Sequence, residues 1–203
     1  DDDVNDAATQ TFTASVTDVG LAIAAGSASL DEDASNSDAV MTASITEGTP
    51  TTVSIISGNT DGDSDGNLPF AIATSGAITV NDADDIDYET TTSYTLTVVA
   101  YTSSDTVSAA MTITITDVND QTPTYTAGTT TISVAEGSTA DIDSFAITDT
   151  DTVGTLACAE SGNDADDFAC AISGSTLTVT WSATPNYESA TDSDTNNVYT
   201  YTI

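Results

Sequence analysis

The sequence predicts an all-β protein made of tandem seven-stranded Greek-key β-sandwiches, and three observations support this. Stretches such as "MTITIT" (residues 111–116) alternate apolar and polar side chains, which is the period of a half-buried strand. Clusters of Gly, Asn, Asp and Ser separate these stretches, as in "SGNTDGDSDGN" (57–67). Similar segments recur roughly 100 residues apart, the length of one sandwich domain.

Strands with one apolar face are expected in both halves of the chain. In the first half, "YTLTV" (94–98) and "MTITIT" place Thr on one face and larger apolar residues on the other. In the second half, "TLTVTW" (176–181) has the same pattern, so Trp181 is expected in a core. No segment has a convincing helical period. The sequence therefore predicts a first repeat at residues 21–120 and a second at 121–203.

The second repeat ends before its last strand. In the first repeat, "YTLTV" is followed by a loop and by "MTITITDVND" (111–120), whereas "YTYTI" (199–203) ends the chain. Residues 1–20 resemble the missing piece, because "TFTASVTDV" (11–19) matches the last strand of the first repeat. They are predicted to complete a preceding or neighbouring repeat. The chain is then a window from a longer tandem array, or a subunit that exchanges its N-terminal strand. A frayed tail beside an incomplete second domain is a third possibility.

The charge is one-sided: 33 Asp and Glu residues, no Lys, Arg or His, and a formal net charge of −33. Such self-repulsion destabilises a compact state, so bound metal ions or a salty medium are expected to offset it. Nucleic-acid binding requires basic residues, and no apolar run is long enough to span a bilayer. No cationic side chain is present for acid–base or oxyanion work, so we do not expect an enzyme. With no initiator Met, the sequence is expected to be a mature chain or an excised piece.

The two cysteines, Cys158 and Cys170, lie close together in the sequence. A zinc site is a poor interpretation, because no His or further Cys is near. A local disulfide is expected instead, which fits an extracellular or cell-surface location.

Several motifs together resemble the cadherin repeat, with bacterial-type repeats of extracellular adhesins or filaments as the nearest kind. The first repeat contains, in order, "SLDEDAS", "VSIISGN", "PFAIATSGAITV", "IDYE", "YTLTVVA" and "TITITDVNDQTP". The second contains "SVAEGS", "ITDTDTVG", "FACAISGSTLTV" and "PNYE". The resemblance implies Greek-key sandwiches with Ca²⁺ at the junction between repeats. Matching motif by motif, it implies these ligands: Glu32, Asp87, Glu89, Asp117, Asn119, Asp120, Asp149 and Asp151.

Other positions are weaker or depart from the motif. Glu136 and Glu188 are further candidate ligands in the second repeat, although Asn186 replaces the Asp of "DYE" there. The first repeat has "TEGT" (46–49) where the second has "DTDT", so we expect metal mainly at the middle junction. The loop "DGDSDG" (61–66) has the spacing of a calcium loop. Its twelfth residue is Ile72, however, so a surface turn is as good an interpretation. Its acidic positions are Asp61, Asp63 and Asp65.

These features predict a calcium-stiffened extracellular structural or adhesive module, forming a stalk, a surface adhesin or a filament shaft. Its expected partners are further copies of itself, end to end, and neither nucleic acid nor a membrane. One alternative is the subunit of an extracellular filament that polymerises by N-terminal strand exchange. Another is a recognition module for a sugar or a protein partner, which clustered exposed aromatic residues in a pocket would favour.

Overall fold

The computed structural model describes residues 10–16, 20–126 and 131–203, and it divides into two compact units, Asp1–Thr116 and Asp117–Ile203. Within the described residues, helix is limited to two short 3-10 turns, Ala165–Asp167 and Tyr187–Ser189. The prediction of an all-β fold is confirmed. No helix in this part of the chain has the length and apolar character needed to cross a membrane.

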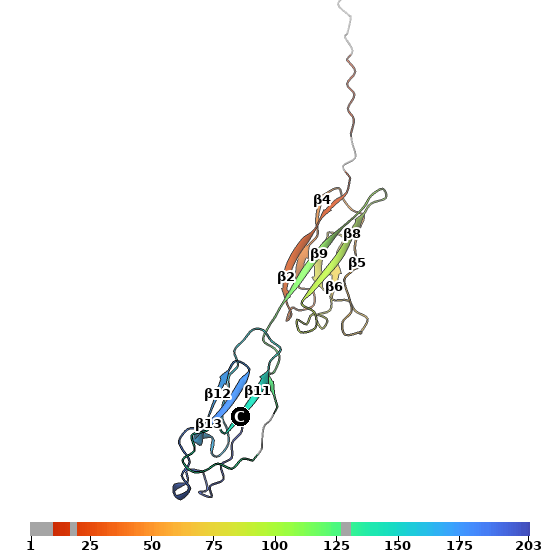
Figure 1. Cartoon of the computed structure of the whole chain (residues 1–203). Coiled ribbons are helices and arrows are strands. Elements are labelled where there is room, and N and C mark those ends of the chain that lie inside the picture. Colours follow the sequence, from red (N-terminus) through yellow and green to blue (C-terminus); the bar gives the residue numbers. More distant parts are fainter. Residues whose placement is uncertain (1–9, 17–19, 127–130) are drawn as a thin grey trace, which may run out of the picture. The chain divides into compact units, whose positions relative to one another are not determined.

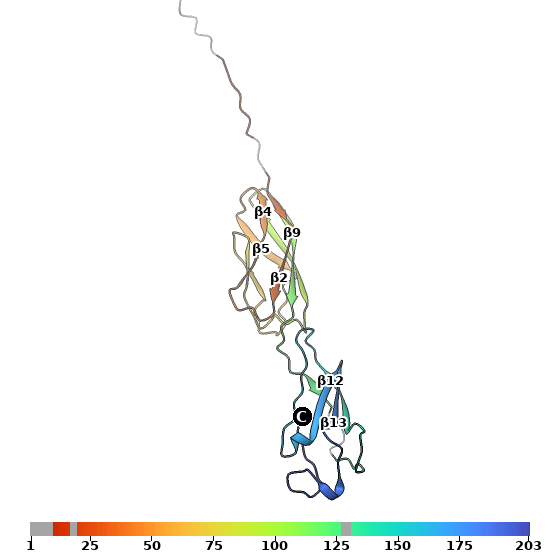
Figure 2. The same ribbon diagram turned by 90° about the vertical axis from the view of Figure 1, so that its left-hand side faces the viewer.

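Unit 1 is a β-sandwich whose two sheets enclose one hydrophobic core (Figures 1 and 2). The larger sheet has the order β2-β9-β8-β5, with bounds Gly26–Asp31, Thr106–Thr116, Ser93–Tyr101 and Thr52–Ser57. The smaller sheet has the order β3-β7-β6, with bounds Ala39–Thr42, Ala77–Val80 and Phe70–Ile72. A separate pair joins β1 (Ala22–Ala24) to β4 (Ser44–Glu47).

Strand β9 lies inside the larger sheet, parallel to β2 and antiparallel to β8. Its side chains alternate as the sequence predicts. Met111, Ile113 and Ile115 are at most 1% exposed, whereas Thr114 on the other face is exposed. The last strand of the repeat therefore carries a central part of the core and pairs with a neighbour on each side.

One end of unit 1 collects the loops that matter for the candidate site. Strand β5 runs antiparallel to β8, β8 antiparallel to β9, and β9 parallel to β2. The last residues of β2, β5 and β9 and the first residue of β8 therefore meet at the same end, which we call the Thr116 end. Glu32 directly follows β2 there, and its N–H donates to the carbonyl of Thr116.

Unit 2 has one sheet, with the order β10-β11-β13-β12 and bounds Thr124–Tyr125, Asp143–Thr148, Thr176–Trp181 and Phe168–Ser173. The β12–β13 hairpin, "FACAISGSTLTV", repeats the β6–β7 hairpin, "FAIATSGAITV", of unit 1. In both units a third strand pairs with the second strand of the hairpin. This sheet therefore corresponds to the smaller sheet of unit 1.

The larger sheet of unit 1 has no counterpart among the strands described in unit 2. A single bridge, Ser161 to Thr202, marks its position. In the repeat alignment this bridge matches the Ser57–Thr97 pair that joins β5 to β8. Residues 198–203 thus occupy the position of β8 but form no strand.

A disulfide joins Cys158 to Cys170 in unit 2, across a sequence separation of 12 residues. Cys170 lies in β12, and Cys158 lies in the segment that corresponds to β5. The bond therefore ties the unpaired part of unit 2 to its sheet.

Candidate metal centre

The first carboxylate cluster lies at the Thr116 end of unit 1 and contains Glu32, Asp87 and Glu89. One oxygen from each lies within 4.8 Å of the others. Glu32 is 6% exposed, and its Oε2 accepts a hydrogen bond of 2.6 Å from the Tyr88 N–H. Glu32 lies in one sequence motif, whereas Asp87 and Glu89 share another, and the fold brings the two motifs together.

A second cluster in unit 1 joins the loop between β5 and β6 to a residue that the motifs did not indicate. Asp61 and Asp63 lie with Asp85, again with one oxygen each within 4.8 Å. Asp85 is 6% exposed, and its Oδ1 accepts the N–H groups of Gly62 and Asp63 at 2.6 and 3.1 Å. Its Oδ2 is buried and has no hydrogen-bond partner within the described part of the chain.

The charges in this loop cluster act on one another. The Asp65 N–H donates to Asp63 and is the largest influence on the pKa of Asp63, which it lowers. Burial and the carboxylates of Asp65, Asp85 and Asp82 outweigh this hydrogen bond, so the pKa is raised above its usual value. A raised carboxyl pKa means that the negative form is disfavoured where it stands. A bound cation would relieve this repulsion.

The third cluster is in unit 2 and contains Asp117, Asp149 and Asp151. Each has a buried Oδ1 without a hydrogen-bond partner among the described residues. Both the N–H and the hydroxyl of Thr152 donate to Oδ2 of Asp117, which fixes that carboxylate beside the 149–152 loop. A buried acceptor oxygen without a donor is costly unless a cation binds it.

The pKa of Asp151 is raised above its usual value. Burial raises it first, against a lowering by the Gln121 N–H, and the carboxylates of Asp149, Asp117 and Asp120 raise it further. Asp120 therefore belongs to the same negative surroundings.

The side chain of Asn119 packs directly against Gly154. Gly154 has a φ of +91°, and a Cβ built on it would lie 1.9 Å from Oδ1 of Asn119. A larger residue at position 154 would therefore displace the Asn119 amide.

The remaining candidate ligands lie outside these clusters. Glu136 accepts from the Tyr187 N–H at 3.3 Å, which repeats the Glu32–Tyr88 contact of unit 1. Within the described residues of unit 2, however, neither Glu136 nor Glu188 belongs to a cluster of three carboxylates, and both are exposed. Asp65 is not in the loop cluster either, and its Oδ1 accepts from the Asn67 N–H.

Fold and site define an acid-rich repeat protein of β-sandwich type, with carboxylate clusters at repeat ends. A comparison with solved structures specifies this class of protein further, because 174 chains of known structure match this chain. The protocadherin GammaB4 extracellular domain aligns with a TM-score of 0.64 at 20% identity, covering 85% of this chain and 28% of that one. Cadherin domains 3–6 of protocadherin Gamma B2 align at 0.60 and 24% identity, covering 84% and 40%. Domains EC22–24 of mouse cadherin-23 align at 0.57 and 21% identity, covering 82% and 55%.

The chain therefore has the fold of cadherin-like repeats, as the motifs predicted. It spans between 28% and 55% of the length of these three matched chains. No protein-family model matches the sequence, and no curated protein is similar to it.

Proposed function

We propose that this chain is a calcium-stiffened structural module of an extracellular stalk, adhesin or filament shaft. The observation that carries the proposal is the set of buried carboxylate oxygens without hydrogen-bond partners, on Asp85, Asp117, Asp149 and Asp151. Calcium takes six to eight oxygen ligands at about 2.3–2.6 Å, and carboxylates from separate segments commonly supply them. The donor sets consist of carboxylates and one amide, so they fit calcium better than a softer metal.

In unit 1, calcium would be held by Glu32, Asp87 and Glu89. In unit 2, it would be held by Asp117, Asn119, Asp120, Asp149 and Asp151. The Glu32 N–H donates to the carbonyl of Thr116, and Asp117 is the next residue in the sequence. We expect ions bound there to limit motion between the repeats, and the charge of −33 to be partly neutralised. The disulfide supports an oxidising, extracellular location.

Chelation tests the proposal directly. Removing calcium with EGTA is expected to lower the melting temperature, because calcium binds the folded clusters and not the unfolded chain. At a concentration 100 times its dissociation constant, calcium would stabilise the fold by about 2.7 kcal/mol per site. Calorimetry in calcium and in EGTA measures this difference, with equimolar magnesium as the ionic-strength control. If both conditions give the same melting temperature, calcium is not structural in this chain.

The loop cluster offers a prediction at one residue. An Asp85→Asn chain keeps the acceptor for Gly62 and Asp63 but loses the buried negative charge. We expect it to bind fewer calcium ions in titration calorimetry and to gain less stability from calcium. Asp84→Asn is the matched control, because Asp84 is exposed and lies outside the clusters. An Asp85→Asn chain that binds as many ions as the control would remove this cluster from the proposal.

A recognition module remains the second candidate, since unit 2 does have a pocket lined by aromatic side chains, among them Tyr187 and Tyr199. Its position in the fold, however, favours a different occupant. An enzymatic role has no support from the sequence, which lacks every cationic side chain.

A further inference from the structure

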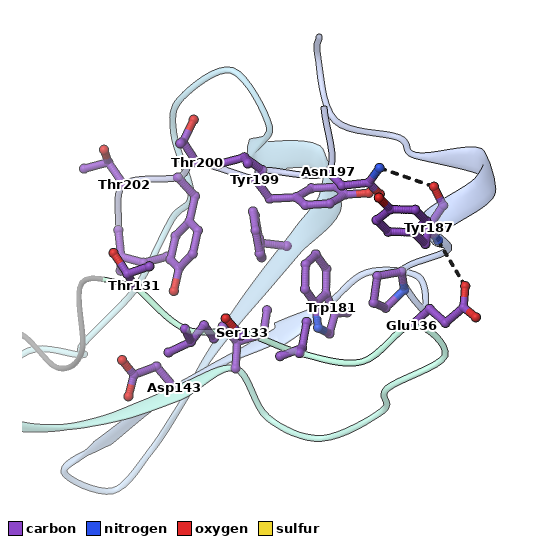
Figure 3. Close-up of a pocket in the computed structure, with 18 of the residues that line it drawn as sticks. Thr131, Ser133, Glu136, Asp143, Trp181, Tyr187, Asn197, Tyr199, Thr200 and Thr202 are labelled. Carbon is purple, nitrogen blue, oxygen red and sulfur yellow. Dashed lines mark hydrogen bonds between the residues drawn. The ribbon is translucent and has the colours of Figure 1, made fainter. Parts of the chain in front are cut away.

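Unit 2 contains a groove with a volume of about 830 Å³, lined mainly by apolar and aromatic side chains. Thr131 and Ser133 lie along one side of it, and Tyr199, Thr200 and Thr202 lie along the other (Figure 3). The floor includes Phe168 and Trp181, whose rings stack at 5.0 Å between centroids.

The two sides of this groove correspond to the two neighbours of β9 in unit 1. Residues 131–134 align with the part of β2 that ends at Leu30, and residues 199–203 align with "YTLTV" of β8. In unit 1, β9 lies between these neighbours and pairs with both. In unit 2 neither side forms a strand, and no strand of the described residues lies between them. The groove therefore has the position in unit 2 that β9 has in unit 1.

Burial supports this equivalence. Leu30 in β2 is 9% exposed, whereas Val134, its counterpart, is 42% exposed and the nearby Ile132 is 40% exposed. On the floor, the indole Nε1 of Trp181 is buried and has no acceptor among the described residues. A strand in the groove would cover the apolar side chains and bring carbonyl and hydroxyl oxygens near this N–H.

The chain also contains a segment of the right kind. Residues 10–16, "QTFTASV", are all exposed and pair with no strand within the described chain; Phe12 is 83% and Val16 is 96% exposed. The segment carries no charge, although the chain carries −33, so its burial would not desolvate a carboxylate. Aligned with β9, Phe12, Ala14 and Val16 take the positions of Met111, Ile113 and Ile115, which are the buried face.

We propose that the groove of unit 2 binds residues 11–16 of a second copy of this chain, as a strand in the position that β9 has in unit 1. The strand runs parallel to residues 131–134 and antiparallel to residues 199–203. By the pairing of unit 1, Phe12 lies beside Tyr201 and Ala14 beside Tyr199, as Met111 lies beside Leu96 and Ile113 beside Tyr94. Val16 lies beside Val134, as Ile115 lies beside Leu30.

We favour a second copy over the chain's own N-terminus, because the segment between Val16 and Leu21 is short compared with the length of β9. The Leu21 N–H donates to Asp105, in the turn just before β9, so Leu21 is fixed at the far end of that strand. Strand β9 has 11 residues and extends over roughly 35 Å before Asp117. Four residues separate Val16 from Leu21, and they span at most about 18 Å. If each copy inserts its residues 11–16 into the groove of the next copy, the copies are linked end to end.

The inference goes beyond the proposed function and does not depend on calcium. Its test uses the full chain in which both apolar anchors are made acidic, Phe12→Asp with Val16→Asp. The matched control is Thr13→Asp with Ser15→Asp, which adds the same charge to the other face of the strand. We expect the unaltered chain and the control to form assemblies in sedimentation that dissociate to single chains on a denaturing gel. We expect the anchor variant to stay monomeric.

A peptide gives a second readout. Adding the peptide TFTASVTDVG to the anchor variant is expected to shift the emission of Trp181, the single tryptophan of the chain, to shorter wavelength. The same peptide with both anchors changed to Asp should have no effect. A monomeric unaltered chain, or an anchor variant that assembles like the control, overturns the proposal. Both assays are expected to give the same result with and without calcium. The proposed function is tested separately by the melting temperature in EGTA, so the failure of one proposal is distinguishable from the failure of the other.

Discussion

Replacing Ile113 by alanine is expected to lower the free energy of unfolding of unit 1 by about 2–5 kcal/mol. Ile113 is 0% exposed and lies in the central strand of the larger sheet, so alanine leaves a cavity among neighbours that pack on both sides. Denaturant unfolding, with hydrogen exchange of the β9 amides to separate the two units, measures the loss. Thr114→Ala is the control, because Thr114 is exposed on the same strand, and its effect should stay within about 0.5 kcal/mol.

This variant also measures what unit 2 lacks. If a single side chain of the last strand contributes several kcal/mol in unit 1, a unit without that strand has lost the equivalent of three such side chains. An effect of Ile113→Ala no larger than that of Thr114→Ala would mean that the last strand is dispensable. The argument for a strand acceptor in unit 2 would then lose its energetic basis.

Removing the disulfide, by Cys158→Ser with Cys170→Ser, is expected to destabilise unit 2 by about 3 kcal/mol. The bond closes a loop with a sequence separation of 12 and ties a segment without strand structure to β12. Because Trp181 is the only tryptophan and lies in β13, its fluorescence follows the unfolding of unit 2 selectively.

Exchange of the β9 amides in unit 1 serves as the internal control for the disulfide variant and should not change. An unaltered Trp181 transition would show that the sheet of unit 2 holds without the bond. Adding the N-terminal peptide should restore part of the lost stability, because it pairs with residues 199–203, to which the segment that carries Cys158 is joined by the Ser161–Thr202 bridge.

The sequence predicted the strands of unit 1 well because each has its own alternating pattern, as "YTLTV" and "MTITIT" do. It also indicated Glu32 and Asp87, since short motifs mark the loops that carry them. Asp85 was missed because nothing local distinguishes it in "NDADDIDYE"; only the fold brings it to Asp61 and Asp63. When a ligand comes from a distant loop, no characteristic spacing in the sequence marks it.

Unit 2 shows the other limit. The patterns of "SVAEGST" and "YTYTI" match those of β2 and β8, yet residues 131–135 and 198–203 form no strands. Alternation describes which face of a segment can be buried, whereas a strand also requires a hydrogen-bonding neighbour. The sequence did not predict that both of these segments would remain without strand structure.

The parallel pairing of β2 with β9 has a mechanical consequence. The chain enters β2 at Gly26 and leaves β9 at Thr116, and parallel pairing puts these two points at opposite ends of the sheet. Tension along the chain would therefore load the β2–β9 hydrogen bonds in shear, all at once, and would not peel them apart singly. Unit 2 would acquire the same resistance to pulling when a strand lies between residues 131–134 and 199–203.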